Sequence, residues 1–309
     1  MISWGKQNGK RRFKCKNCGI YFTAENKSVG LKNKEIWFKK WIIGKQTYEQ
    51  ISAESGYSVS TLQRYFNVML VKAPKLSYSQ NKEVYLLIDG TYFSNEICLV
   101  VYRDNVFKQT QLYRITDGEH YEELKEDLEN ILNLGIKIGG ITCDGDKSLL
   151  KAIRKVCPKV PAQRCLVHIQ RMCKIWLSAY PKSVAGFELR EIVCKLHFVD
   201  SEVKKQYWIK EFLDWFEKHK DFLNEKSYSL ETGRYWYTHK MVRRCFSVIR
   251  KALPNMFTFL QNHKIPKTTN GIESFFGHLK GNLNIHRGLT KSRRKKFIQW
   301  YLFYKNLKS

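Results

Sequence analysis

The sequence predicts an α/β fold that carries a large all-helical insertion, and three observations lead to this prediction. Short apolar runs of strand length occur between residues 84 and 143, and two of them run directly into Asp-Gly. Apolar residues at helical spacing separate and follow these runs, which favours alternating strands and helices. The stretch from 171 to 262 has aromatic residues at helical spacing, as expected for a helical subdomain with its own core.

Length and charge narrow the class of protein. A chain of 309 residues suggests about two domains. Its 55 Lys and Arg against 28 Asp and Glu give a net charge of +27, which favours a polyanion, most commonly nucleic acid. An anionic membrane surface is the rival partner, but no apolar run approaches the length that spans a bilayer. The start lacks the apolar core of a signal peptide, so we expect a cytoplasmic, nucleoid-associated protein without a membrane partner.

Residues 1–30 form a basic segment that resembles part of a zinc ribbon. Cys15 and Cys18 have the Cys-x-x-Cys spacing, with Gly19 directly after the second cysteine. A structural zinc site needs four ligands, and no second Cys-x-x-Cys occurs in this sequence. Either the other pair lay upstream of Met1, or the segment is a basic hairpin without metal. Zinc therefore stays an open question.

Residues 31–75 predict a helix-turn-helix DNA-binding region. Residues 48–55 suit a first helix, Gly56 a tight turn, and residues 58–66 a second helix. The side chains expected to approach a major groove are those of Thr61, Gln63 and Arg64. An ordinary helical hairpin is the alternative.

Residues 80–170 and 263–309 are expected to form the catalytic domain, and 171–262 the helical insertion. Strands are predicted for 84–89, 96–103, 108–115, 138–143 and 162–167, with helices over 119–134 and 147–156. Three strands in series, a helix, and then parallel strand–helix units suit a ribonuclease-H-like fold. The core of the insertion is expected to include Trp208, Phe212, Trp215, Trp176 and Trp236.

Three carboxylates stand out within this frame. Asp89 and Asp144 each follow a predicted buried strand and precede a glycine, and Glu273 begins a helix in which Asn270 is a candidate N-cap. A carboxylate at a buried strand end is costly without a cationic partner. Two divalent cations about 4 Å apart, held by a few carboxylates, activate an oxygen nucleophile and stabilise the leaving oxygen in phosphodiester chemistry. Magnesium or manganese, two ions per site, suits such ligands. Asp146 is the alternative to Asp144.

Four segments together resemble the Mutator-like superfamily of transposases, as encoded by prokaryotic insertion sequences. They are Ile88-Asp89-Gly90-Thr91, Cys143-Asp144-Gly145, Arg164-Cys165-Leu166-Val167-His168 and Thr269-Asn270-Gly271-Ile272-Glu273-Ser274. The resemblance covers roughly residues 84–305. It implies that Asp89, Asp144 and Glu273 form a catalytic DDE triad, and that the 129 positions from Asp144 to Glu273 hold the helical insertion. Cys165 and His168 match the family's Cys-x-x-His signature, for which we expect a role in shaping the wall of the site.

Further basic residues are candidates for DNA contact. Lys280 lies two helical turns beyond Glu273 and hence on the same face. The run Arg293, Arg294, Lys295 and Lys296 could follow a phosphate backbone.

The expected function is that of a DNA transposase that binds its element's terminal repeats and target DNA as a homodimer or higher oligomer. It would cleave DNA and transfer the freed strand with Mg²⁺ or Mn²⁺. The alternatives are a ribonuclease-H-type nuclease without strand transfer and a non-enzymatic repressor descended from a transposase.

Overall fold

The computed structural model describes residues 1–7, 9–23, 27–76, 83–93, 97–307, and the chain forms two compact units. Unit 1 comprises Met1–Pro74 with Gly281–Tyr304, and unit 2 comprises Lys75–Lys280 with Lys305–Ser309. No helix in the described ranges is long and apolar enough to cross a membrane. The expected catalytic domain included all of 263–309, whereas most of that segment belongs to the compact unit of the N-terminal region.

Unit 1 begins with an antiparallel sheet of three strands, β1 (Ile2–Gln7), β2 (Lys10–Lys14) and β3 (Tyr21–Thr23). The helices α1 (Lys27–Ile43), α2 (Tyr48–Ser55) and α3 (Val59–Val71) follow. The two helices predicted around Gly56 are present. Thr47 and Gln50 form a capping box at the start of α2, and Gly56 ends it with a φ of 72°. Ser58 caps α3 by accepting a hydrogen bond from the Thr61 N–H.

The core of unit 1 joins both ends of the sequence. The fully buried rings of Trp41 and Phe297 meet edge to face, with their centroids 5.3 Å apart. His286 Nε2 donates to the carbonyl of Trp41 at 3.2 Å, and Trp300 Nε1 donates to the carbonyls of Met69 and Lys72. These contacts explain why residues 281–304, which include most of α11 (Lys291–Asn306), complete the N-terminal unit.

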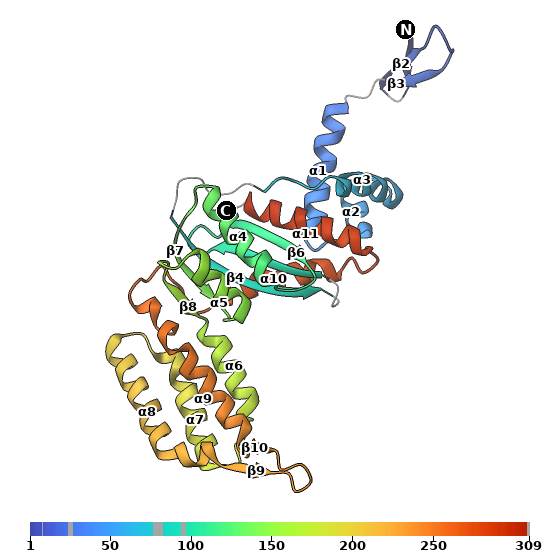
Figure 1. Cartoon of the computed structure of the whole chain (residues 1–309). Coiled ribbons are helices and arrows are strands. Elements are labelled where there is room, and N and C mark those ends of the chain that lie inside the picture. Colours follow the sequence, from blue (N-terminus) through green and yellow to red (C-terminus); the bar gives the residue numbers. More distant parts are fainter. Residues whose placement is uncertain (8, 24–26, 77–82, 94–96, 308–309) are drawn as a thin grey trace. The chain divides into compact units, whose positions relative to one another are not determined.

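Unit 2 is built on a mixed sheet with the strand order β6-β5-β4-β7-β8 (Figure 1). The central strand β4 pairs antiparallel with β5 and parallel with β7. The bounds of the strands are β4 Glu83–Phe93, β5 Ile97–Asp104, β6 Thr110–Thr116, β7 Lys137–Cys143 and β8 Ala162–Arg164. Helices α4 (Tyr121–Asn133) and α5 (Lys147–Val156) cover one face of the sheet.

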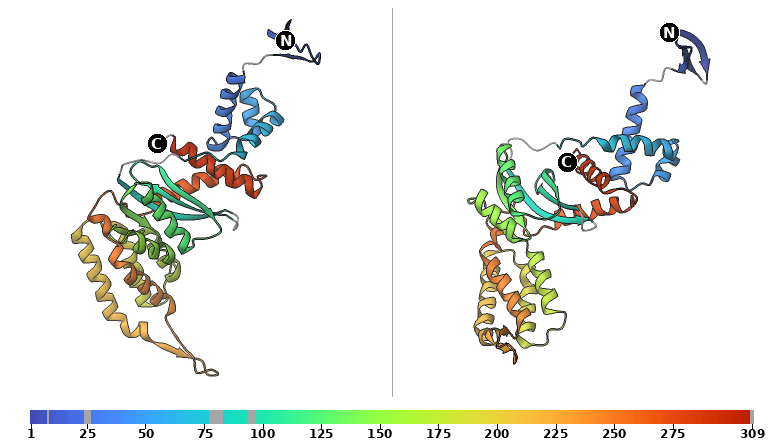
Figure 2. Two further views of the ribbon diagram at one scale, coloured as in Figure 1. Left: turned by 45° about the horizontal axis from the view of Figure 1, so that its top comes forward. Right: turned by 45° about the vertical axis from the view of Figure 1, so that its right-hand side comes forward.

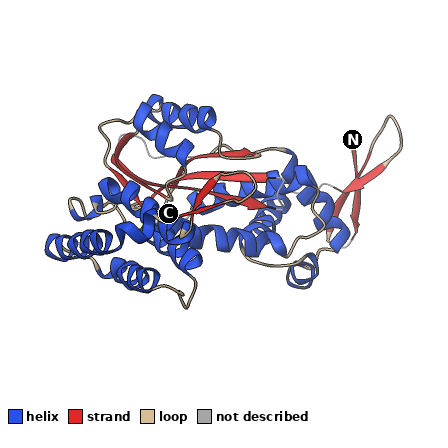
Figure 3. Ribbon diagram, turned by 60° about the horizontal axis from the view of Figure 1, so that its bottom comes forward, coloured by secondary structure: helices blue, strands red, loops and turns tan. Residues whose placement is uncertain are grey.

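Side chains alternate across β4, so its two faces have different partners. Val84, Leu86 and Ile88 pack in one apolar cluster with residues of α4 and α5. On the other face, Leu87 lies against Gly271 of α10 (Asn270–Asn284), and Arg103 of β5 stacks over Phe275 at 4.5 Å. Helices therefore flank the sheet on both faces, as Figure 3 shows. Asp89 shares the face of Leu87, the one that α10 approaches.

The helical segment of unit 2 has a core of its own. Its long helices are α6 (Leu166–Leu177), α7 (Val184–Lys195), α8 (Glu202–Asn224) and α9 (Lys240–Ala252), which run side by side in both views of Figure 2. Three short 3-10 turns are Leu196–Phe198, Leu253–Asn255 and Thr258–Leu260. Trp208, Phe212 and Trp215 are buried at its centre as predicted, and Trp176 packs against them.

The sequence prediction differs from the structure in four places. Asp89 does not end its strand, because β4 continues to Phe93 along β5. The last predicted strand stops at Arg164, and α6 begins at Leu166. The helical segment contains a hairpin of β9 (Lys226–Tyr228) and β10 (Tyr235–Tyr237), which leaves Trp236 exposed rather than in the core. Asn270 is the first residue of α10 and therefore not its N-cap.

Candidate functional site: a carboxylate cluster on the central sheet

The pairing of β4 with β7 brings the two aspartates side by side. The parallel register pairs Leu87 with Thr142 and Ile88 with Cys143. The next residue along β4 is Asp89, and the residue that follows the end of β7 is Asp144. Asp89 lies on the face of Leu87, because side chains alternate along a strand, and Asp144, the residue after β7, is close enough for its charge to raise the pKa of Asp89. Asp89 lies within β4, whereas β7 ends beside it at Cys143. The space next to Asp89 is therefore open because β7 ends there, although β4 continues.

Glu273 comes to the same place from the first turn of α10. Its Oε2 accepts a hydrogen bond from Arg171 at 3.0 Å, and its Oε1 lies 3.7 Å from Nδ1 of His168. Thr269, the residue before α10, donates its hydroxyl to the same Oε1 at 3.4 Å. Thus Glu273 is held by side chains of α6 and by Thr269.

Cys165 and His168 hold the start of α10 against the start of α6. The backbone N–H and the hydroxyl of Thr269 both contact Cys165 Sγ at 3.2 Å, and the same hydroxyl lies 3.2 Å from His168 Nδ1. The predicted wall residues therefore lie directly beside Glu273. His168 is closer to the carboxylates than the prediction required: one ligand atom from each of Asp89, His168 and Glu273 lies within 4.8 Å of the others.

The electrostatics of the cluster favour binding a cation. Burial, and then the negative charges of Asp144 and Glu273, raise the pKa of Asp89 to about 7, although His168 opposes the shift. The hydrogen bond with Cys165 and the nearby carboxylates raise the pKa of His168. Carboxylates that repel one another in a partly buried site are stabilised by a divalent cation, for which their oxygens are the preferred ligands. Imidazole is a less suitable ligand for Mg²⁺, so His168 fits a role as a charged neighbour.

Glu119 is a further carboxylate at this site, and the sequence analysis missed it. A Cβ atom placed on Gly90 would collide with the Glu119 carboxylate, so that carboxylate lies directly against the β4 backbone next to Asp89. Burial, followed by the charges of Asp144, Asp146 and Asp89, raises the pKa of Glu119 to about 7. No sequence motif includes Glu119. It approaches β4 only because the chain, after the β5–β6 hairpin, returns across the sheet before α4 begins.

The glycine after Asp144 and the nearby Asp146 also have clear structural roles. Gly145 has a φ of 93°, and a Cβ there would collide with the Arg164 guanidinium. Asp146 caps α5 by accepting hydrogen bonds from the N–H groups of Ser148 at 2.7 Å and Leu149 at 3.1 Å. Its own N–H donates to Asp144 Oδ1 at 2.9 Å. Because capping occupies Asp146, Asp144 is the better candidate ligand.

The residues predicted to contact DNA lie in both units. In unit 1, Gln63 and Arg64 are exposed on α3, whereas the Thr61 hydroxyl bonds with that of its cap Ser58 at 2.9 Å. Arg293 is exposed, Lys295 and Lys296 are half-buried, and Arg294 donates to the carbonyls of Leu289 and Arg287. In unit 2, Lys280 lies 5.7 Å from the centre of the Phe93 ring.

Cys15 and Cys18 lie at the turn between β2 and β3. The N–H of Cys15 donates to Ile20, and its carbonyl accepts from Gly19 at 3.0 Å. Hydrogen bonds from the backbone of Cys18 and Asn17 lower the pKa of the Cys15 thiol. Within the described part of the chain, no third potential zinc ligand joins this pair.

Comparison with known proteins finds a family match for part of the chain. No curated protein matches the chain. Residues 107–230 match the family model described as transposase, Mutator family. The match runs from the turn between β5 and β6 to just beyond β9 and includes Asp144, Cys165 and His168, while Asp89 and Glu273 lie outside it. It confirms the resemblance predicted from the sequence: over residues 107–230 this chain has the sequence pattern of a Mutator-family transposase.

Proposed function

We propose that the chain is a DNA transposase that cleaves a phosphodiester at its element's ends and joins the freed strand to target DNA. One observation carries the proposal: Asp89, Asp144 and Glu273, separated by up to 184 positions, come close enough that burial and the charges of Asp144 and Glu273 raise the pKa of Asp89. The strand order β6-β5-β4-β7-β8 supports a ribonuclease-H-like fold, in which such a cluster belongs at the centre of the sheet.

The three carboxylates fit the role of ligands for two Mg²⁺ or Mn²⁺ ions, because they supply the oxygen donors that these cations prefer. Bound divalent ions would supply activation of an oxygen nucleophile and stabilisation of the leaving oxygen. His168, Arg171 and Thr269 would orient the Glu273 carboxylate, and Cys165 would fix Thr269. Glu119, held against Gly90, would add negative charge beside Asp89 and Asp144.

The reaction needs two displacements at phosphorus. In the first, a water oxygen attacks a phosphodiester at the element's end, the bond to the 3′-oxygen breaks, and a 3′-hydroxyl and a 5′-phosphate result. In the second, that 3′-hydroxyl attacks a target phosphodiester, loses its proton and displaces the target's own 3′-oxygen. Each step makes one P–O bond and breaks one, so no external energy source is required.

The experiment that tests this proposal is a nicking and strand-transfer assay on DNA that carries the element's terminal repeat, with and without Mg²⁺ or Mn²⁺. Asp89→Asn and Asp144→Asn should abolish both reactions while DNA binding persists. Asp146→Asn is the matched control, because it alters the cap of α5 and leaves the proposed ligands in place.

Two rival functions give different results in the same assay. A nuclease of the ribonuclease-H type would nick but not join strands. A transposase-derived repressor would bind the repeat without any metal-dependent nicking, and that result would overturn the proposal.

A further inference from the structure

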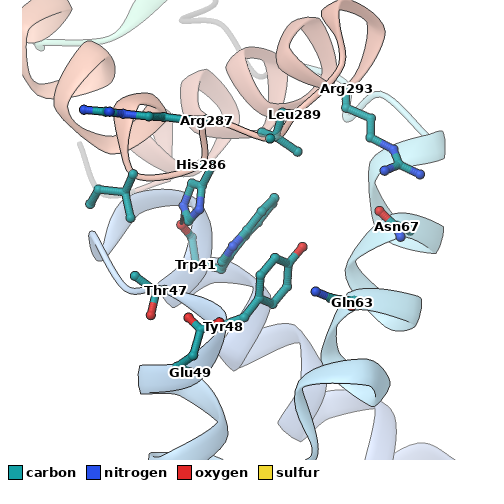
Figure 4. A pocket seen from close by; sticks show the side chains of 12 residues that line it. Trp41, Thr47, Tyr48, Glu49, Gln63, Asn67, His286, Arg287, Leu289 and Arg293 are labelled. Carbon is teal, nitrogen blue, oxygen red and sulfur yellow. Dashed lines mark hydrogen bonds between the residues drawn. The ribbon is translucent and has the colours of Figure 1, made fainter.

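Unit 1 contains a pocket of about 480 Å³ between α2, α3 and the segment that joins α10 to α11 (Figure 4). Gln63 and Asn67 of α3 and Arg293 of the later segment lie near one another at one end of the pocket, whereas the Arg287 side chain extends away from them at the other end. Trp41, Tyr48 and His286 lie between them. Residues more than 200 positions apart in sequence thus converge on one cavity.

The polar groups that line the pocket are of two chemical kinds, amides and arginines. The amides of Gln63 and Asn67 offer both donors and acceptors, the combination that reads the edges of bases. Arg287 and Arg293 are exposed cations, suited to phosphate oxygens. Glu49 is the one acid in the lining, and in Figure 4 it lies at the opposite end of the pocket from Arg293. The end of the pocket that holds Arg293 is therefore the end that an anion would occupy.

The centre of the pocket has hydrogen-bonding capacity that the protein does not use. The Nε1 donor of Trp41, a fully buried side chain, has no partner among the residues that the structure describes. The Tyr48 hydroxyl points into the space below Leu289 and Arg293 in Figure 4. Of these two groups, the Tyr48 hydroxyl is the one that a ligand in the pocket could meet, because the Trp41 Nε1 atom has almost no accessible surface.

The geometry points to this pocket as the site where unit 1 grips one strand of duplex DNA. Arg287 and Arg293 meet phosphates of that strand, and Gln63 and Asn67 meet the edges of adjacent bases. This inference rests on the proposed function and goes beyond it in two respects. Tight DNA binding by unit 1 requires the segment 281–304 as well as α3, and within the basic run Arg293 contacts phosphate while its neighbours do not.

The test measures binding of the full chain to two labelled 30-base-pair duplexes, one from the terminal repeat and one of scrambled sequence, over a series of salt concentrations. Arg287→Gln and Arg293→Gln should each lower the slope of log affinity against log salt by about one on both duplexes. Gln63→Ala and Asn67→Ala should leave the slope unchanged and reduce the preference for the repeat about tenfold.

Lys295→Gln and Lys296→Gln are matched controls, because they remove equal charge from the same helix outside the pocket. They should change the slope by much less than Arg293→Gln does. A double-mutant cycle then tests whether the two residues act together. The fold-loss of affinity in the Gln63→Ala/Arg293→Gln double variant should be at least three times smaller than the product of the two single fold-losses, since both residues act on one strand. Gln63→Ala with Lys296→Gln should be multiplicative.

Equal slope changes at positions 293, 295 and 296, or a multiplicative Gln63–Arg293 cycle, would show that the pocket is not the DNA site. Displacement of the duplex by millimolar dAMP, with an unchanged salt slope in the arginine variants, would assign the pocket to a free nucleotide and overturn the inference. Failure of the wild-type chain to bind either duplex would instead refute the proposed function.

Discussion

The two units contrast in how they treat buried polar groups. In unit 1, the core is aromatic, and the ring nitrogens of the buried His286 and the half-buried Trp300 donate to backbone carbonyls. In unit 2, carboxylates gather around Asp89 and Gly90 of the central strand, where burial and their mutual repulsion raise their pKa values. The first arrangement stabilises the unit by itself, whereas the second is costly until a cation joins it. Folding stability and chemistry are thus assigned to different regions.

The largest expected effect tests the chemical side of this contrast. Glu273→Gln keeps the shape of the side chain but offers a poor ligand to a hard cation. Nicking and strand transfer should fall by about three orders of magnitude or more, since removing charge stabilisation of this kind costs several kcal/mol. The melting temperature should stay close to that of the wild type, because the partner Arg171 is half exposed and such ion pairs contribute little.

The control for Glu273 is Glu188→Gln. Glu188 also pairs with a cation and a histidine, Lys218 and His219, but it lies on α7 in the helical segment. Its loss should leave nicking unchanged. Near-normal activity of Glu273→Gln would show that Glu273 is not part of the site. The chemistry could then no longer be assigned to the carboxylates of unit 2.

The stability side is tested at Trp41. Trp41→Ala removes a fully buried ring that contacts Phe38, Phe66 and Phe297, so it should destabilise unit 1 by about 3–5 kcal/mol. Thermal unfolding should then show an early transition that Trp208→Ala, a substitution in the core of the helical segment, does not produce. A single transition lowered equally by both substitutions would mean that the units unfold together.

Gly90→Ala tests how closely the carboxylates are packed. The new Cβ would collide with the Glu119 carboxylate and force it away from Asp89. We expect nicking to fall about tenfold, on the scale of an altered neighbour of a metal ligand. Adding Glu119→Ala to Gly90→Ala relieves the collision, so the double variant should be more stable than Gly90→Ala in chemical denaturation. Equal stability of the two would show that Glu119 does not lie against Gly90.

The smallest effect is a pH dependence of stability without metal. Asp89 and Glu119 each have a pKa of about 7 in the folded chain, against about 4 in an unfolded one. Between these values the folded state binds more protons, so stability falls as pH rises from 4 to 7. The loss should be on the order of 1 kcal/mol for each group after allowance for solvent screening. Denaturation curves for Asp89→Asn should show a shallower fall, and a fall as steep as that of the wild type would contradict the assignment.

Local elements, and the types of residue in the candidate site, could be predicted from short stretches of the sequence. Apolar runs bounded by turn residues located the strands, as in 138–143, and Gly56 located the turn between α2 and α3. The pairing of Asp89 with Asp144 followed from two strands that each lead into Asp-Gly. These features depend on neighbours within a few residues, so they can be read from a single sequence.

The tertiary structure alone decided what depends on contacts between distant segments. Nothing near Glu119 indicates that a hairpin returns it to Gly90, and nothing near His286 indicates that it bonds to Trp41. Asp89 was expected at a strand end, yet β4 continues because β5 offers it hydrogen bonds as far as Phe93. Thr269, and not Asn270, precedes α10, and its hydroxyl bonds with Cys165 and His168, about a hundred residues away. Local patterns specify which residues can form a strand, a cap or a ligand, but their partners are fixed only when burial of the whole core selects one arrangement.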